Sequence, residues 1–416
     1  MNARSAALVL CLTLTAVCAG AQSAGKHGGQ AYNQPGADTA QQLEVYGFGQ
    51  ADAIYEFKQS NPSWFDVNRP SRLPSFEGEF GRDGRSWLSA RQSRFGAKGR
   101  KLTPLGVVKT QFDFDMFGVG PDAGQTTIRL RNAYGQLGQF GAGQLDSPFM
   151  DSDVFPNILE YWGPNGMLYF RNVQVFWQPV NHDNTRITVA IERPGASGDQ
   201  GLYADRVEIQ NISPRFPTPD LSAEWRIGQK WGYVELAGIV RSLAWDDNLV
   251  DTLDLNGSDV GWGFSLSSNI KAGHSNVFRL QAIYGEGVEN YFNDAPIDVG
   301  LQHNLNNRLT PVVGKALPDL GLVAYLDHRW DPAWTSALGW SMVQITNSDA
   351  QAANAFHQGQ YASTNLLYQP IPQVLMGGEF QWAHRQNFAD GFSTNNYRLQ
   401  FSFKYSFSRT FGGMSP

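Results

Sequence analysis

The most constraining feature of this chain is a stretch near its C-terminal end, residues 396–407, in which polar and apolar residues alternate. From Tyr397 the apolar set is Tyr397, Leu399, Phe401, Phe403, Tyr405 and Phe407, and the polar set is Arg398, Gln400, Ser402, Lys404 and Ser406. A period of two places the two sets on opposite faces of a β-strand. Five aromatics in six positions, with tyrosines towards the ends, are typical of a lipid-facing strand. A soluble β-sandwich also alternates and is the alternative at this point.

Residues 1–21 have the features of a secretory signal peptide. Arg4 supplies the charge, residues 6–17 the apolar region and Ala19–Ala21 the small-residue cleavage site. A membrane anchor fits less well, because the apolar run is short and rich in threonine. Both cysteines, Cys11 and Cys18, lie within this segment, so we expect a mature chain without disulfides.

The composition after residue 21 favours a membrane barrel. No apolar run approaches the roughly twenty residues of a spanning helix. Yet the chain holds 12 Trp, 15 Tyr, 26 Phe and 44 Gly. Within lipid, only helices and closed barrels pair all their backbone groups internally. The formal net charge of −6, with scattered basic residues, makes nucleic-acid binding a poor hypothesis.

Sixteen alternating segments follow one another along the chain. Predicted strands are 43–58, 86–99, 105–117, 126–137, 139–145, 167–178, 185–193, 221–229, 231–245, 259–271, 275–286, 320–330, 333–346, 357–368, 373–386 and 396–407. Seven short connections alternate with eight longer ones, as periplasmic turns alternate with extracellular loops. The pattern predicts an all-β fold, a 16-stranded antiparallel transmembrane β-barrel at 43–407 with both termini in the periplasm. Residues 22–42 form a flexible periplasmic lead-in and residues 408–416 a C-terminal tail.

The third long connection, residues 146–166, combines acids with large apolar groups. It contains Asp146, Asp151, Asp153 and Glu160 beside Phe149, Phe155, Tyr161 and Trp162. A loop folded into the barrel buries such rings against the wall and presents its acids to the lumen, which at sixteen strands is aqueous. We therefore predict an in-folded third extracellular loop. Calcium binding, or bridging of lipopolysaccharide through divalent cations, is the alternative use of these acids.

Basic residues on polar strand faces are candidates for an anion-attracting wall opposite this loop. The candidates are Arg94, Lys109, Arg129, Arg131 and Arg171. A basic wall draws carboxylates into a narrow passage, and arginine binds them in a bidentate manner.

The position of each basic residue in the alternation indicates which strand face it occupies, clearly for some residues and ambiguously for others. Arg94 shares a parity with Lys98, whereas Arg91 does not and is expected at a rim or bulge. Asn172 and Gln174 favour the opposite face for Arg171. Each interior arginine also has a plain alternative: it is solvated, or paired with an interior acid such as Asp113.

One region resembles a known family. Gln125–Gly138, Gly143–Asp151 and Gly163–Gly166 are similar to the DcaP-like trimeric outer-membrane porins; the specific resemblance covers about residues 124–177 and the remainder matches in layout. It implies a homotrimer, a pore narrowed by the third loop, and passive uptake of small anions, dicarboxylates in particular. Arg94, Arg131 and Arg171 match positions where porins keep a basic wall. Residues 22–42 lack the heptads of the helical segment usual in the family, so the trimer would rest on barrel contacts.

The last strand also resembles the closing strand of Gram-negative outer-membrane barrels, although nine residues follow Phe407. The expected function is passive diffusion of small hydrophilic solutes through an outer-membrane porin that prefers anions. A general or sugar-passing porin, with Phe155, Tyr161 and Trp162 stacking on sugar rings, is the main alternative. A structural or adhesin-like barrel and an outer-membrane hydrolase are further alternatives.

No enzyme signature supports the hydrolase. The sequence has no Gly-x-Ser-x-Gly turn and no histidine pair with zincin spacing. We expect no catalytic residue, no cofactor and no metal. The expected partners are two further copies of the chain, outer-membrane lipid and lipopolysaccharide, small anionic solutes, and the barrel-assembly machinery during biogenesis, without nucleic acid.

Overall fold

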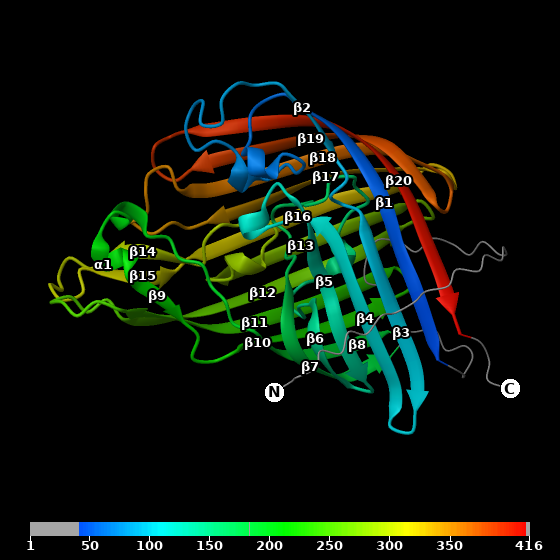
Figure 1. The fold of residues 1–416 in the computed structure, drawn as a ribbon, viewed down its shortest axis with the longest axis horizontal. Coiled ribbons are helices and arrows are strands. Elements are labelled where there is room, and N and C mark those ends of the chain that lie inside the picture. Colours follow the sequence, from blue (N-terminus) through cyan, green and yellow to red (C-terminus); the bar gives the residue numbers. More distant parts are fainter. Residues whose placement is uncertain (1–40, 183, 413–416) are drawn as a thin grey trace, which may run out of the picture.

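A closed barrel of sixteen antiparallel strands forms the body of the protein (Figure 1). The computed structural model describes residues 41–182 and 184–412. The barrel closes where β1 (Gln42–Glu56) pairs with β20 (Ser393–Phe411) over fourteen residue pairs. Closure removes the unpaired sheet edges that lipid does not tolerate. The predicted fold class is therefore confirmed.

The wall strands agree with the predicted ones to within four residues at either end. Between β1 and β20 they are β2 (Arg85–Ser89) with β3 (Arg94–Thr103), β4 (Gly106–Phe117), β5 (Thr126–Leu137), β6 (Phe140–Asp146), β7 (Arg171–His182), β8 (Thr185–Glu192), β10 (Asp220–Gln229), β11 (Gly232–Asp247), β12 (Gly257–Ala272), β13 (Asn276–Glu286), β16 (Pro318–Arg329), β17 (Trp334–Ile345), β18 (Phe356–Ile371) and β19 (Val374–Asn387). No helix in the described ranges is long and apolar enough to cross a membrane.

The second wall strand is interrupted, because β2 and β3 both pair with β1 and leave residues 90–93 between them. Arg91 lies in this break. Its guanidinium bonds to Asp66 Oδ1 at 2.6 Å and donates to the carbonyl oxygens of Gly118 and Gln125 at 2.7 and 3.0 Å. These bonds hold Arg91 outside the regular strand. The alternation is interrupted there, so Arg91 and Arg94 differ in parity.

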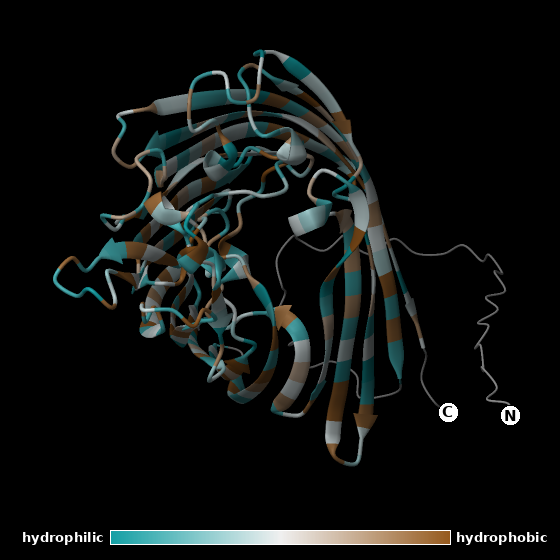
Figure 2. Cartoon of the chain, turned by 60° about the vertical axis from the view of Figure 1, so that its left-hand side comes forward, coloured by the Kyte–Doolittle hydropathy of each residue, from teal (hydrophilic) through white to brown (hydrophobic). Residues whose placement is uncertain are grey.

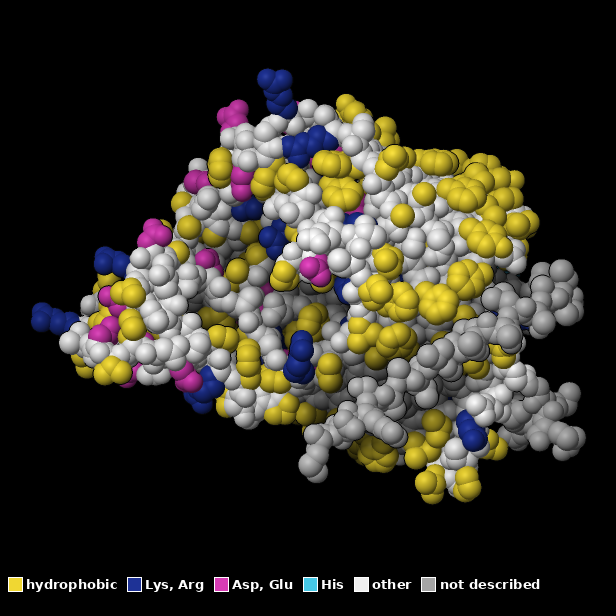
Figure 3. Space-filling view, viewed as in Figure 1, with side chains coloured by type: hydrophobic (Ala, Val, Ile, Leu, Met, Phe, Trp, Pro, Cys, Tyr) yellow, Lys and Arg dark blue, Asp and Glu magenta, His cyan; other side chains and the backbone are white. Residues whose placement is uncertain are grey.

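The two faces of the strands separate as the alternation predicts. On β20 the side chains of Leu399, Phe401 and Phe403 are exposed on the outer surface, whereas Arg398 and Gln400 are buried on the inner one. Figure 2 shows this alternation along many strands, and Figure 3 shows hydrophobic side chains gathered on the outer wall. An apolar outer face and a polar interior are the arrangement of a membrane barrel.

Short turns join the strands at one end of the barrel and long loops at the other, as predicted. Three loops matter for the interior: loop 1 (57–84), loop 3 (147–170) and loop 6 (287–317). The loops also carry the helix α1 (Val207–Gln210) and the strands β9 (Ile212–Arg215), β14 (Val299–His303) and β15 (Val312–Ala316), which group together at the left of Figure 1. The sequence prediction missed these elements.

At its C-terminal end the barrel is longer than predicted. β20 extends to Phe411, four residues beyond the predicted end of the barrel. The predicted signal peptide at 1–21 lies outside the described residues, as does the lead-in at 22–42 apart from its last two residues.

Candidate functional site

The inner wall and loops 1, 3 and 6 enclose a cavity of about 2120 Å³. Its charged lining is mostly basic, with twelve Lys and Arg residues against seven Asp and Glu. The cations are Arg69, Arg72, Arg94, Lys98, Arg100, Arg129, Arg131, Arg171, Arg186, Arg226, Lys404 and Arg409; the acids are Glu44, Asp113, Asp146, Asp151, Asp153, Glu160 and Glu224. This excess contrasts with the formal net charge of −6 for the whole chain.

A bulge in β5 concentrates charge at one point of this wall. The register between β4 and β5 shifts after Asp113. A bulge lets two successive side chains face the same side. Asn132 accordingly donates to Asp113 Oδ2 at 2.9 Å, while Arg131 Nη1 lies 2.9 Å from Asp115 Oδ2. Arg129 Nη2 lies 2.8 Å from the same oxygen, so two arginines share one carboxylate.

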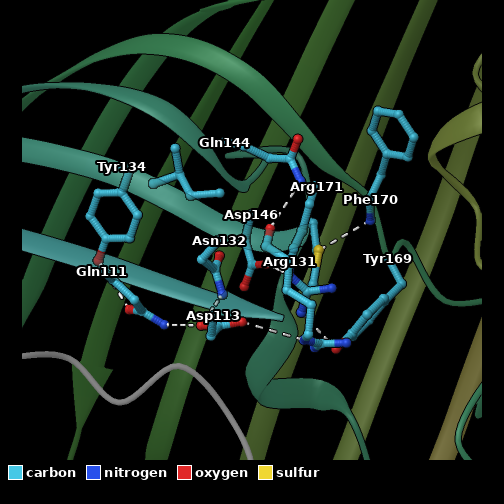
Figure 4. A network of polar contacts seen from close by, with 12 residues as sticks. Gln111, Asp113, Arg131, Asn132, Tyr134, Gln144, Asp146, Tyr169, Phe170 and Arg171 are labelled. Carbon is cyan, nitrogen blue, oxygen red and sulfur yellow. Dashed lines mark hydrogen bonds and ion pairs between the residues drawn. The ribbon is translucent and has the colours of Figure 1, made fainter. Parts of the chain in front are cut away.

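Arg171 joins these residues from β7 (Figure 4). Its Nε lies 2.8 Å from Asp146 Oδ1, and its Nη2 donates to the Tyr169 hydroxyl at 3.0 Å. The later β7 residues of the same parity, such as Val175, are exposed on the outer face. Arg171 nevertheless lines the cavity. It is the first residue of β7, directly after loop 3, and its side chain bonds to Asp146 and Tyr169.

Arg94 also lines the cavity, whereas Lys109 does not. Among the described residues Arg94 forms no ion pair, and its guanidinium carbon lies 5.4 Å from the centre of the Phe48 ring. Lys109 stands near the turn that precedes β4, opposite Arg100 and Gln136. The structure thus brings four of the five predicted basic residues to the cavity.

The acids at the start of loop 3 do not face this group. Asp151 bonds to Arg226 Nη2 at 2.6 Å, to the Tyr233 hydroxyl at 2.7 Å and to Ser267 Oγ at 2.5 Å. Asp153 Oδ2 lies 2.5 Å from Arg226 Nη1. These contacts tether the loop to β10, β11 and β12. Asp146, the last residue of β6, is in contrast the predicted acid that pairs with a predicted arginine in the described ranges.

Arg226 is a site residue that the sequence interpretation missed. It lies on β10 within hydrogen-bond distance of Glu235 as well, with Nε 2.5 Å from Oε2. A usable signal was present, because Arg226 has the same parity as Ser222 and Glu224, which are both buried on the inner face.

Glu160 is buried and serves the loop itself. Its carboxylate accepts hydrogen bonds from the backbone N–H groups of Asn68, at 3.1 Å, and Gly163. Burial, and then the nearby Glu379 carboxylate, raise the pKa of Glu160 to about 8. Glu160 thus contributes to the cavity lining, while its carboxylate accepts hydrogen bonds from the backbone of loops 1 and 3.

Tyr161 and Trp162, which follow Glu160, each contact side chains or backbone groups of other elements. The Tyr161 hydroxyl contacts Arg129, Arg131 and Asp115, and its ring stacks on Phe117 with centroids 4.3 Å apart. Trp162 Nε1 donates to the carbonyl oxygen of Asn293 in loop 6 at 2.5 Å.

Further contacts of loop 3 go to inward-facing groups of distant strands. Leu159 N donates to Glu379 Oε2 on β19 at 2.7 Å, and its carbonyl accepts from Gln400 on β20 at 3.3 Å. Ser341 Oγ on β17 donates to Asn165 Oδ1 at 2.6 Å. These bonds favour a position of the loop within the barrel.

Loop 1 contributes buried residues and packs against loop 3, which was not predicted. Val67 and Leu73 are each 1% exposed. The guanidinium carbon of Arg69 lies between two rings, 4.2 Å from the centre of Trp64 and 4.3 Å from that of Trp162. The sequence shows Trp64 in loop 1 and Trp162 in loop 3, but no local pattern predicts that their side chains are in contact.

No group of three or more His, Cys, Asp or Glu side chains is arranged to hold a metal ion in the part of the chain that the structure describes.

Comparison with solved structures shows a porin fold. The outer membrane channel DcaP of Acinetobacter baumannii matches with a TM-score of 0.73 and 20% identity, covering 88% of this chain and 97% of that one. The anion-selective porin from Comamonas acidovorans gives 0.57 and 9%, covering 88% and 100%. OmpT of Vibrio cholerae in its trimer form gives 0.53 and 10%, covering 89% and 100%.

A search of curated protein sequences finds no match to the chain. The model of the DcaP outer membrane protein family, however, matches residues 25–407, well over half of the sequence. The protein therefore belongs to the DcaP outer membrane protein family and is an outer-membrane β-barrel channel.

Proposed function

We propose that this channel is a porin for passive diffusion of small hydrophilic anions, with a preference for dicarboxylates. One observation carries the anion preference: the cavity is lined by twelve basic and only seven acidic residues, although the chain as a whole is acidic. A narrow passage with low-dielectric walls of one sign concentrates solutes of the opposite sign.

The arginine cluster, defined as Arg94, Arg129, Arg131 and Arg171, is the proposed selectivity element. Asp115 and Tyr161 hold two of its guanidinium groups in place before any solute arrives. Guanidinium groups bind carboxylates in a bidentate manner, so a fixed cluster suits anions that carry carboxylates. Asp115 pairs with Arg129 and Arg131, Asp113 lies 3.7 Å from Arg131, and Asp146 pairs with Arg171. The four arginines therefore face three carboxylates, which leaves one positive charge in excess.

Loop 3 is the proposed constriction. Its contribution differs from the expected acidic loop facing a basic wall, because Asp151 and Asp153 are engaged by Arg226 and Glu160 is buried. The loop instead places the Tyr161 hydroxyl against Arg129 and Arg131 of the arginine cluster, while Asp146, the last residue before the loop, pairs with Arg171. We assign selectivity to the arginine cluster on the wall. Loop 3 narrows the passage and supports the cluster.

The proposed assembly is a homotrimer with the short turns and both termini in the periplasm. Support comes from the family and from the related OmpT fold in its trimer form. After removal of the signal peptide at 1–21 and insertion by the barrel-assembly machinery, the apolar outer wall would contact lipid and lipopolysaccharide.

A sugar-passing porin has weaker support. Stacking on sugars needs accessible ring faces, but Tyr161 stacks on Phe117, and Trp162 packs against Arg69 and Trp64.

Reversal potential across a planar bilayer under a salt gradient tests the proposal. We expect anion selectivity, and interruptions of the current when a dicarboxylate is added to one side. Arg131→Gln and Arg171→Gln should weaken both effects, whereas Lys109→Gln, outside the cavity lining, should not. Cation selectivity of the unmodified channel, or the absence of any dicarboxylate effect, would refute the preference and leave a general porin.

A further inference from the structure

A single carboxylate on the barrel wall accepts hydrogen bonds from two successive backbone N–H groups of loop 3. Glu379 Oε2 on β19 accepts from Leu159 N at 2.7 Å, and Glu379 Oε1 accepts from Glu160 N at 3.1 Å. Glu379 is 2% exposed and is not part of the cavity lining. It therefore holds the main chain of the loop and does not contact a solute in the cavity.

The Glu379 carboxylate is itself held in place by neighbouring side chains of the wall. Asn365 Nδ2 on β18 donates to Oε2 at 3.0 Å, and Gln381 Nε2 donates to Oε1 at 3.0 Å. Asn365 is directly opposite Glu379 in the strand register, and Gln381 is two positions along the same strand, so all three face the interior. Each carboxylate oxygen thus accepts one bond from the wall and one from the loop, and the wall bonds orient the group toward the loop.

Further polar side chains of the wall bind the same stretch of loop 3. Asn365 Nδ2 also donates to the Asn157 carbonyl oxygen at 2.8 Å, and Gln400 Nε2 donates to the Leu159 carbonyl oxygen at 3.3 Å. Glu379 differs from these amides because it is an acid, and hydrogen bonds to a charged acceptor are roughly twice as strong as those between neutral groups. The two bonds from Glu379 are therefore the main attachment of this stretch to the wall.

The loop residue that follows this attachment reaches the arginine cluster. Tyr161 comes directly after Glu160, and its hydroxyl contacts Arg129 and lies 2.6 Å from Arg131 Nη1. Only one Cα–Cα step of about 3.8 Å separates Tyr161 from Glu160, so a shift of the attached backbone moves Tyr161 as well. Hydrogen bonds weaken steeply outside a narrow range of distance and angle, so the hydroxyl keeps its contacts only while that backbone is held.

We propose that Glu379 is a positioning residue for the constriction: it holds the backbone of Leu159 and Glu160 against β19 and thereby places the Tyr161 hydroxyl on the arginine cluster. The inference rests on the proposed roles of loop 3 and of the arginine cluster. It adds a residue that touches neither the solute nor the cluster. Two parts of the wall, β19 and β5, then determine together where the loop narrows the passage.

Glu379→Gln tests the inference, because it keeps the size of the side chain. Glutamine has one acceptor oxygen and an NH2 donor, so it accepts from one of the two loop N–H groups and opposes the other with a donor. The time that a single channel spends in its main conductance level, relative to other levels, should fall about tenfold, since one charged hydrogen bond is lost.

Asp319→Asn on β16 is the matched control for the loss of a buried acid. Asp319 is 1% exposed, like Glu379 it belongs to the inner wall, and it accepts no hydrogen bond from loop 3 in the described ranges. This variant should keep the level pattern of the unmodified channel.

A thiol reporter measures release of the loop directly. Leu159 is 4% exposed, and both native cysteines lie within the predicted signal peptide, so Leu159→Cys supplies the single thiol of the processed chain. A charged methanethiosulfonate should modify this thiol about tenfold faster when Glu379→Gln is added, because the released population rises by that factor. Adding Asp319→Asn should not change the rate. A contribution of Glu379 to overall stability alone would lower the heat-unfolding midpoint and leave both measurements at room temperature unchanged.

The outcomes separate this inference from the proposed function. Unchanged conductance levels together with an unreactive thiol in Glu379→Gln would overturn the positioning role and leave the anion preference intact. An unmodified channel without anion selectivity would overturn the anion preference, whereas faster thiol modification would still support the hold of Glu379 on the loop. Asn365→Ala removes a donor that orients the carboxylate and keeps Glu379 itself. It should also speed thiol modification, so it decides the question if Glu379→Gln fails to fold.

Discussion

Arg69 in loop 1 donates a hydrogen bond from Nε to Asp294 Oδ1 in loop 6 at 2.8 Å, across 225 positions of the sequence. Asp294 also accepts from the Ser71 backbone N–H at 2.8 Å and from its hydroxyl at 2.5 Å. The Arg69 guanidinium lies between Trp64 of loop 1 and Trp162 of loop 3. The buried ion pair therefore joins loops 1 and 6, and the Arg69 guanidinium links both to Trp162 of loop 3.

Asp294→Asn should loosen this junction. The substitution leaves the buried Arg69 charge without its carboxylate, and breaking such a pair costs ~3–5 kcal/mol. We expect faster tryptic cleavage after Arg72 in the detergent-solubilised protein. Asp83→Asn is the control, since its pair with Lys58 is 43–53% exposed and such pairs contribute little. Equal cleavage rates in the two variants would contradict the role of Asp294.

Asp115→Asn should increase anion selectivity. This carboxylate is the shared partner of Arg129 and Arg131, so its neutralisation adds about one net positive charge to the arginine cluster. The reversal potential under a salt gradient should move towards the anion equilibrium value. Asp251→Asn, in an exposed loop, should not move it. A shift towards cation selectivity would count against the cluster as the selectivity element.

Glu160 should make stability depend on pH. Its pKa in the folded protein is about 8, against an ordinary value of 4.5, because the carboxyl group is buried. Between these values the folded protein keeps a proton that the unfolded chain has lost, so stability falls as pH rises through this window. The heat-unfolding midpoint in detergent should decline from pH 5 to 8 and then level off.

The Glu160→Gln variant tests that slope directly. It should be flatter over the same range and more heat-stable than the unmodified protein at pH 8. Glu77→Gln, an exposed substitution in loop 1, should keep the original slope. A slope that survives in Glu160→Gln would assign the pH dependence to other groups.

Gly166→Ala should displace the end of loop 3 from the wall. A Cβ at this position would overlap the carbonyl oxygens of Met342 on β17 and Leu322 on β16. Overpacking of this kind typically costs ~1–3 kcal/mol, so the unfolding midpoint should fall. Gly378→Ala, with nothing within 4 Å of the added carbon, is the control. An unchanged midpoint in Gly166→Ala would mean that the loop end shifts at no cost.

The strands of this protein could be predicted from the sequence because their information is local. Alternation along residues 397–407 states which side chains face lipid and which face the interior, without reference to any partner strand. The same reasoning separates Arg129 and Arg131 from Ile128 and Leu130. The alternation of short and long connections then predicts the order of the strands in the sheet, because strands that follow each other in the sequence usually pair.

The contents of the barrel were decided only by the tertiary structure. Arg69 with Asp294, Asp151 with Arg226 and Leu159 with Glu379 are pairs of residues 75 to 225 positions apart. Nothing local relates their members, because closure of the wall determines which inner faces surround a loop. The sequence by itself determined the wall and its two faces, whereas closure decided which charges are paired and which remain to attract a solute.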